Sequence, residues 1–353
     1  MVFPCVRYSP PCSEINGQSG SWRSESIDCS ALSLSVSAGY YAPWGRRMKK
    51  ETILIVISYA LIYIVWGSTY FFIKAAVATI PATVIVGLRF LFGSLLLAGI
   101  ARARGGLKTL PSLKEFAGAA CIGLLLLLAG NGLVTLAEQT IPSWTASVVV
   151  ACMPIYVAFY NFLLYRTKVS AIRLAGALGG VIGVGLLLFQ GTSDNPIGFG
   201  LVFAIAGALA WGFGTSLAKA LPKPKDVLVS TSIQMLVAGT TALIIGAVSG
   251  VSITAALASA SAWSLFSMGY LALLGALALV AYNHLLVVEP TFRVSSYSLV
   301  NPLIAVVLGL AAGEKASPFF AIGSPLVLAG LIAILYGDAI RDRLRRGRVA
   351  SQG

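Results

Sequence analysis

Residues 52–73 read TILIVISYALIYIVWGSTYFFI and contain no charged side chain. A helix of this length extends roughly 33 Å at about 1.5 Å per residue, which is enough to cross the hydrocarbon core of a bilayer. The run begins directly after Lys49, Lys50 and Glu51 and ends at Lys74, so charged residues mark both of its ends. This stretch predicts a membrane-spanning helix.

The rest of the chain is similarly apolar. Of its 353 residues, 58% are hydrophobic and only 10% are charged, and the mean hydropathy is +0.88. A soluble domain carries roughly 25% charged residues, so this composition excludes soluble enzymes. The expected fold is an all-α polytopic membrane protein with ten spans. The nine further apolar runs are 81–101, 116–137, 144–165, 172–190, 197–218, 227–248, 263–287, 294–313 and 317–337.

Positive charge is distributed unevenly between these runs. If the N-terminus is cytoplasmic, 20 lysines and arginines fall on the cytoplasmic side, whereas only Lys74 and Lys315 fall outside. Such a bias follows the positive-inside rule and predicts that both termini face the cytoplasm. The basic residues stand in small groups between long uncharged runs, so the net charge of +13 is explained by topology. No nucleic-acid partner is expected.

Several residues recur about 145 positions later in the chain, which indicates an internal repeat. The matched pairs are Trp66 with Trp211, Lys74 with Lys219, and Pro154 with Pro302. Each half contains five predicted spans, and because five is odd the second half must enter the membrane from the opposite side. This predicts an inverted repeat, in which a substrate site lies between the halves and access to it alternates.

The expected organisation has four parts. Residues 1–47 contain ten serines and few large aliphatic residues, which is typical of a disordered tail or an over-extended gene start; we expect the true start to be Met48. Residues 51–190 and 197–338 form the first and second five-helix repeats, and residues 339–353 form a basic cytoplasmic tail.

Several short segments are similar to one family of transporters. They are Trp66-Gly67-Ser68-Thr69-Tyr70-Phe71, Gly87-Leu88-Arg89-Phe90, Gly130-Asn131-Gly132 running to Ala137-Glu138, and Asn301-Pro302 followed by Gly313-Glu314. Over residues 50–340 the chain resembles the EamA family of the drug/metabolite transporter superfamily, and within it the YedA-type branch of inner-membrane exporters. The resemblance implies two EamA repeats in the bacterial inner membrane and export of small metabolites, amino acids first among them.

Polar and aromatic side chains inside apolar helices are candidates for the transport path, because a polar group is costly in hydrocarbon. Arg89 could bind a carboxylate or phosphate through two hydrogen bonds; the alternative is a structural role, such as capping free carbonyls. Trp66 and Tyr70 have the alternative role of interfacial anchors. The expected substrate-binding residues are Trp66, Tyr70, Arg89, Asn131, Tyr156, Trp211, Tyr282, Tyr297 and Asn301.

The distribution of acids constrains the mechanism. No Asp or Glu lies in the middle of a predicted span, and the lone His284 cannot build a zinc site. We therefore expect no catalytic residue, no metal and no cofactor, and transport by facilitated diffusion or exchange. The open alternative is that Glu138 or Glu289, at the ends of spans, reaches a wet cavity and carries a proton.

The expected partners are a small-molecule substrate and the lipid bilayer. Gly176, Gly179, Gly180 and Gly183 allow close helix packing, either within the bundle or in a homodimer through this glycine-rich span. Two alternatives to metabolite export remain. One is efflux of hydrophobic toxic compounds, and the other is a non-transporting membrane scaffold or receptor.

Overall fold

The computed structural model describes residues 47–106, 110–141, 143–188, 199–311 and 318–350. The chain divides into two units, residues 1–50 and 51–353, and the helical bundle is the second of them. The tail expected at 1–47 lies outside the described residues except for Arg47, where the first described helix begins. Every regular element in the described ranges is helical, as the composition predicts.

The first half contains helices that correspond to the first five apolar runs. In chain order they are α2 (Arg47–Val77), α3 (Ala82–Ala103), α4 (Leu113–Gly123), the π-helix η1 (Leu124–Gly132), α5 (Leu133–Ala137), α6 (Ser143–Ala151), α7 (Met153–Tyr165) and α8 (Ala171–Leu188). The third run is one continuous helical segment whose centre is a π-helix. The fourth run is divided at Cys152, next to Pro154, whose ring cannot donate a backbone hydrogen bond.

The second half follows the same order. Its helices are α9 (Phe199–Leu217), α10 (Val227–Val248), α11 (Ile253–Ala258), α12 (Ala262–Val288), α13 (Thr291–Val294), α14 (Tyr297–Ala311) and α15 (Phe320–Ala350). The short α11 falls in a stretch predicted to be a loop, and Ser252 caps its start. Pro302 lies inside α14. Residues 339–350, expected to form a separate basic tail, continue α15.

Seven of the described helices are long and apolar enough to cross a membrane, and two further apolar helices, Met153–Tyr165 and Ala171–Leu186, are shorter. Large apolar side chains remain exposed on the outer helix faces; Leu95, Ile182 and Val202 are 69%, 61% and 61% exposed. Such a surface is a liability in water, and it suits contact with lipid chains.

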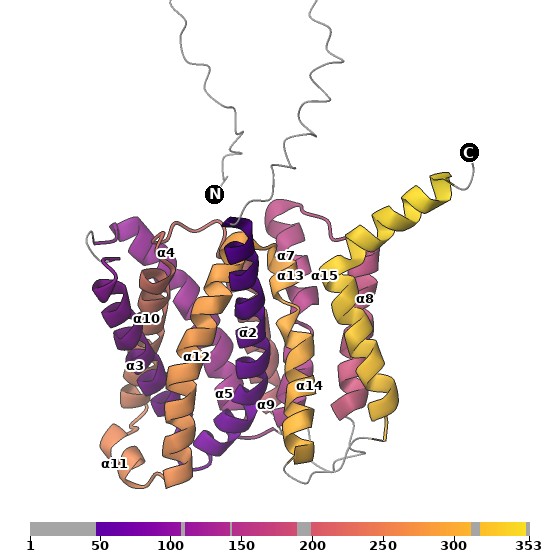
Figure 1. Cartoon of the computed structure of the whole chain (residues 1–353). Helices are drawn as coiled ribbons and strands as arrows, with labels where there is room; N and C mark the ends of the chain where they lie inside the picture. Colours follow the sequence, from indigo (N-terminus) through magenta and orange to yellow (C-terminus); the bar gives the residue numbers. More distant parts are fainter. Residues whose placement is uncertain (1–46, 107–109, 142, 189–198, 312–317, 351–353) are drawn as a thin grey trace, which may run out of the picture. The chain divides into compact units, whose positions relative to one another are not determined.

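Helices that hold equivalent positions in the two halves lie side by side (Figure 1), α3 along α10 and α8 along α15. In the first pair, Gly87 lies against Leu243 and Gly93 lies against Met235. The hydroxyl of Ser94 donates to the carbonyl of Ser232 at 2.8 Å. Because residue numbers rise along α3 as they fall along α10, the two helices are antiparallel.

The glycine-rich helix α8 packs along α15 in the same manner. Gly176 lies against Ala333, and a Cβ at Gly183 would come within 2.8 Å of the carbonyl oxygen of Gly323. These positions therefore serve packing within the chain. A Cβ at Gly179 would meet nothing within 4 Å, so the helix is open at this position, and the homodimer stays a prediction.

Candidate functional site

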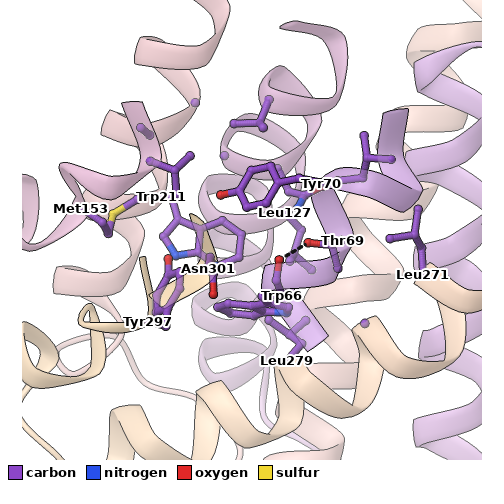
Figure 2. A pocket seen from close by; sticks show the side chains of 18 of the residues that line it. Trp66, Thr69, Tyr70, Leu127, Met153, Trp211, Leu271, Leu279, Tyr297 and Asn301 are labelled. Atoms are coloured by element: carbon purple, nitrogen blue, oxygen red, sulfur yellow. Dashed lines mark hydrogen bonds between the residues drawn. The ribbon is translucent and has the colours of Figure 1, made fainter. Parts of the chain in front are cut away.

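A cavity lies between helices of the two halves. Figure 2 shows Trp66, Tyr70, Trp211, Tyr297 and Asn301 gathered around it. The first half contributes side chains from α2, α3, η1, α5, α6 and α7, and the second half contributes them from α9, α12 and α14. A molecule in this cavity would contact both halves at once.

The aromatic wall of the cavity is centred on Trp66. Its ring centroid lies 5.4 Å from that of Trp211 in an edge-to-face arrangement, 4.9 Å from that of Tyr282 and 4.8 Å from that of Tyr297. The indole nitrogen of Trp211 donates to the Tyr282 hydroxyl at 3.2 Å, and this hydroxyl is also hydrogen-bonded to Thr215. Edge-to-face contacts add to the free energy of burying the rings, so the wall is rigid.

The polar wall is centred on Arg89. Its guanidinium donates to the side-chain oxygen of Asn131 and lies 4.6 Å from the ring centroid of Phe90. Arg89 is 4% exposed, and its Nε has no hydrogen-bond partner among the described residues. Asn131 lies near the end of η1. π-Helical segments often occur at functional sites. The unpaired Nε of a guanidinium that lines the cavity can donate a hydrogen bond to an oxyanion.

The side chain of Asn301 lies deep in the same wall. It is 1% exposed, and its Oδ1 has no hydrogen-bond partner among the described residues. The Tyr70 side chain lies within hydrogen-bonding reach of it. Thr69, next to Tyr70, donates to the carbonyl of Trp66 at 2.7 Å (Figure 2). Asn301 therefore offers an acceptor that a bound ligand could use.

The structure brings most of the predicted site residues together. The ones that line the cavity are Trp66, Tyr70, Arg89, Asn131, Trp211, Tyr297 and Asn301. Tyr282 is fully buried and supports the aromatic wall from behind. Tyr156 is not part of the lining. It packs beside Gly212, where a Cβ added to the glycine would lie 3.0 Å from the Cβ of Tyr156.

Sequence reasoning did not include several residues that shape the cavity. Met153 lines it, as do Gly130 and Gly207. A Cβ at Gly207 would lie 2.7 Å from the carbonyl oxygen of Gly130, so these two glycines let η1 and α9 approach closely. Their pairing depends on the packing of helices from different halves, and no local pattern in the sequence indicates it.

Two lysines make equivalent contacts in the two halves. Lys74 Nζ donates to the backbone carbonyl of Glu138 at 2.6 Å, and Lys219 Nζ donates to the backbone carbonyl of Glu289 at 2.7 Å. Lys74 lies in the last turn of α2 and Lys219 follows the end of α9. Glu138 and Glu289 are the C-caps of α5 and α12, which end the third apolar run of each half. Partial burial lowers the pKa of the Lys219 amino group, whereas the carboxylate of Glu289 raises it.

The chain is similar to one family of transporters and to several known proteins. The model of the EamA-like transporter family matches residues 50–189 and again residues 198–336. The uncharacterized inner membrane transporter YedA of Escherichia coli K12 is 37% identical over 257 residues, which cover 72% of this chain and 81% of that protein. Protein PagO of Salmonella typhimurium is 28% identical over 268 residues, covering 74% and 85%.

A crystal structure of a protein 18% identical in sequence superposes with a TM-score of 0.65 and covers 80% of this chain and 97% of its own. At this identity the superposition supports the fold alone. The family match covers both halves of the chain, in line with the resemblance that the sequence motifs indicate. The chain belongs to the EamA-like transporter family.

Proposed function

We propose that this chain exports small polar or amphipathic metabolites, with amino acids as the leading class, across the bacterial inner membrane by alternating access. The observation that carries the proposal is the cavity built from both halves, with one aromatic and one polar wall. A site shared by two repeats is the architecture in which rocking of one half against the other exposes a substrate to each side in turn.

The chemistry of the walls favours a ligand with an oxyanion and an apolar body. The Arg89 guanidinium, whose Nε is unpaired, would bind a carboxylate, and the side-chain oxygen of Asn301 would accept a hydrogen bond from an ammonium group. Trp66, Trp211 and Tyr297 would cover an apolar or aromatic side chain. An amino acid contains all three features.

The proposed topology has ten spans as two inverted five-helix repeats, with both termini in the cytoplasm. The antiparallel packing of α3 with α10 and of α8 with α15 supports an inverted relation between the halves. The positive-inside bias of the loops supports the orientation. The relative YedA is named as an inner membrane transporter, and this supports the proposed location.

The test is flux through the purified full chain in liposomes. Vesicles are loaded with a mixture of radiolabelled amino acids or with a hydrophobic cationic dye, and the loss of each is followed over time. We expect selective loss of amino acids. Loss of the dye alone would favour efflux of hydrophobic compounds, which the apolar lining Ile73, Phe90 and Leu127 would suit. Loss of neither, with folded protein in the vesicles, would favour a scaffold or receptor.

A further inference from the structure

A buried carboxylate lies next to the cavity without taking part in its lining. Glu138 ends α5 and is 0% exposed, and neither oxygen of its carboxylate has a hydrogen-bond partner among the described residues. A buried ionised carboxylate without partners is costly, so such a group either pairs with a cation or takes up a proton. The sequence places Glu138 at the end of a predicted helix and does not indicate that it is buried. In the folded protein its side chain is buried.

The groups that face Glu138 come from two neighbouring helices. Arg89 of α3 and Lys74 of α2 both act on its charge, and Tyr70 of α2 lies close enough for that charge to act on its hydroxyl. Lys74 uses its amino group on the backbone carbonyls of Glu138 and Ile141 rather than on the carboxylate. Two nearby positive charges therefore influence whether the carboxylate is ionised, and one of them, Arg89, belongs to the cavity.

The equivalent acid in the second half is in a different situation. Glu289 is likewise the C-cap at the end of the third apolar run of its half, helix α12, and it accepts the same lysine hydrogen bond at its carbonyl. Its carboxylate, however, forms a salt bridge of 2.9 Å with Arg293 and is partly exposed. Glu138 and Glu289 share the same backbone position and the same lysine hydrogen bond. Of the two, only Glu138 has a fully buried carboxylate without a partner among the described residues. Glu289 is therefore a matched control.

We propose that Glu138 is a proton-binding site whose occupancy is linked through Arg89 to an anionic group in the cavity. When the cavity is empty, the guanidinium charge favours the ionised carboxylate. When a carboxylate of the substrate binds the Arg89 guanidinium, it neutralises that charge, and Glu138 takes a proton from water. Because linkage is reciprocal, the bound proton in turn strengthens binding of the anion. This inference rests on the proposed function and adds proton coupling to it: the proton and the substrate bind together and move in the same direction, so export occurs when the outward substrate gradient exceeds the inward proton gradient.

Proton binding can be measured without a substrate. Infrared difference spectra of the purified full chain, recorded as the pH is raised, report the carbonyl band of a protonated carboxyl group. The chain's other acidic residues contribute to this band as well, since it has twelve in all. We expect the wild-type spectra to contain one titrating component that is missing in Glu138→Gln and present in Glu289→Gln. Identical titrations of the wild-type protein and Glu138→Gln, or the lack of any such band in the wild-type protein, would overturn the proposal.

The linkage is tested by removing the neighbouring charges. Arg89→Gln and Lys74→Met should each raise the proton affinity of the titrating group roughly tenfold or more, because a nearby positive charge disfavours protonation. Lys219→Met, at the equivalent position of the second half, should leave it unchanged. Lys74 is exposed, so its variant should fold even if Glu138→Gln does not. A titration midpoint that does not move in Arg89→Gln and Lys74→Met would contradict the linkage.

Transport then separates this inference from the proposed function. In liposomes that are more acidic outside than inside, the wild-type protein should accumulate labelled amino acids in the interior. Glu138→Gln should equilibrate them without accumulation. Equilibration without accumulation by the wild-type protein would overturn proton coupling and leave the transporter assignment standing. Lack of any amino-acid flux would overturn the transporter assignment, while the infrared titration would still decide whether Glu138 binds a proton.

Discussion

Trp66 and Trp211 occupy equivalent places in the two halves and contact each other across the cavity. We predict that Trp66→Ala and Trp211→Ala each reduce amino-acid flux by roughly tenfold or more, because loss of an aromatic contact from a closed site costs about 1.4 kcal/mol or more. Flux per folded protein in liposomes is the measurement. Trp263, which is 51% exposed on α12, supplies the control: Trp263→Ala should leave flux unchanged.

A different result would identify these tryptophans as packing residues. If Trp66→Ala and Trp211→Ala both fail to accumulate in the membrane, whereas Trp263→Ala accumulates normally, their role is structural and the aromatic wall is not a binding surface. A normal flux in both variants would likewise exclude them from the site.

At the level of residues, the sequence indicates which polar and aromatic groups lie inside apolar helices, and this is sufficient to find Trp66, Arg89 and Asn301. It does not indicate which face of a helix turns toward the cavity, and for this reason Tyr156, which the sequence predicts in the lining, lies outside it. The burial of Glu138 is also beyond the reach of the sequence, since a residue at a helix end is buried or exposed according to the neighbouring helices.

The helices are held together by close approaches at glycine, and α8 offers a paired test of this. Gly183→Ala would place a Cβ about 2.8 Å from the backbone of α15, whereas Gly179→Ala has open space. We predict that Gly183→Ala lowers stability by roughly 1–3 kcal/mol through overpacking. Gly179→Ala should leave stability unchanged or raise it by up to about 1 kcal/mol, because alanine favours the helix.

The measurement is the midpoint of thermal unfolding of both variants in the same detergent. Equal midpoints for Gly183→Ala and Gly179→Ala would mean that α8 and α15 are not in close contact. A fall in the Gly179→Ala midpoint would place another surface against that face, as a second protomer would.

Apolar runs locate the helices well, because the length needed to cross a bilayer is encoded directly in composition. The positions at which helices change form are harder to predict. The π-helix over Leu124–Gly132 has no proline or charge to mark it, whereas the break at Cys152 lies two residues before Pro154, a residue that marks a helix break in the sequence itself. The π-helix depends on packing between helices, which a local pattern does not encode.

At the scale of the whole molecule, the Lys74–Glu138 and Lys219–Glu289 contacts occupy equivalent positions in the two halves of the proposed inverted repeat. In the proposed topology the Lys74–Glu138 contact lies at the outer end and the Lys219–Glu289 contact at the inner end. Each contact ties the first helix of a half to the end of the third. We predict that Lys74→Met favours the outward-open state and Lys219→Met favours the inward-open state, since each variant loses one closing contact.

The measurement is labelling of Thr69→Cys, in the cavity, by a membrane-impermeant thiol reagent after the native cysteines have been replaced by serine. Lys74→Met should speed labelling from outside by severalfold, and Lys219→Met should speed labelling from inside in inverted vesicles. Identical changes from both sides in both variants would show that the lysines stabilise the fold without closing either end.

The contact between Trp66 and Trp211 also has an optical consequence. The two indole rings meet at 5.4 Å with their planes 87° apart, so their electronic transitions are close enough to couple and their mutual orientation is chiral within the protein. Coupled chromophores in this arrangement produce a paired positive and negative signal in circular dichroism, whose amplitude depends steeply on their separation. Each ring is fixed to a different half of the chain. The unlabelled protein therefore contains its own spectroscopic ruler for the distance between its halves.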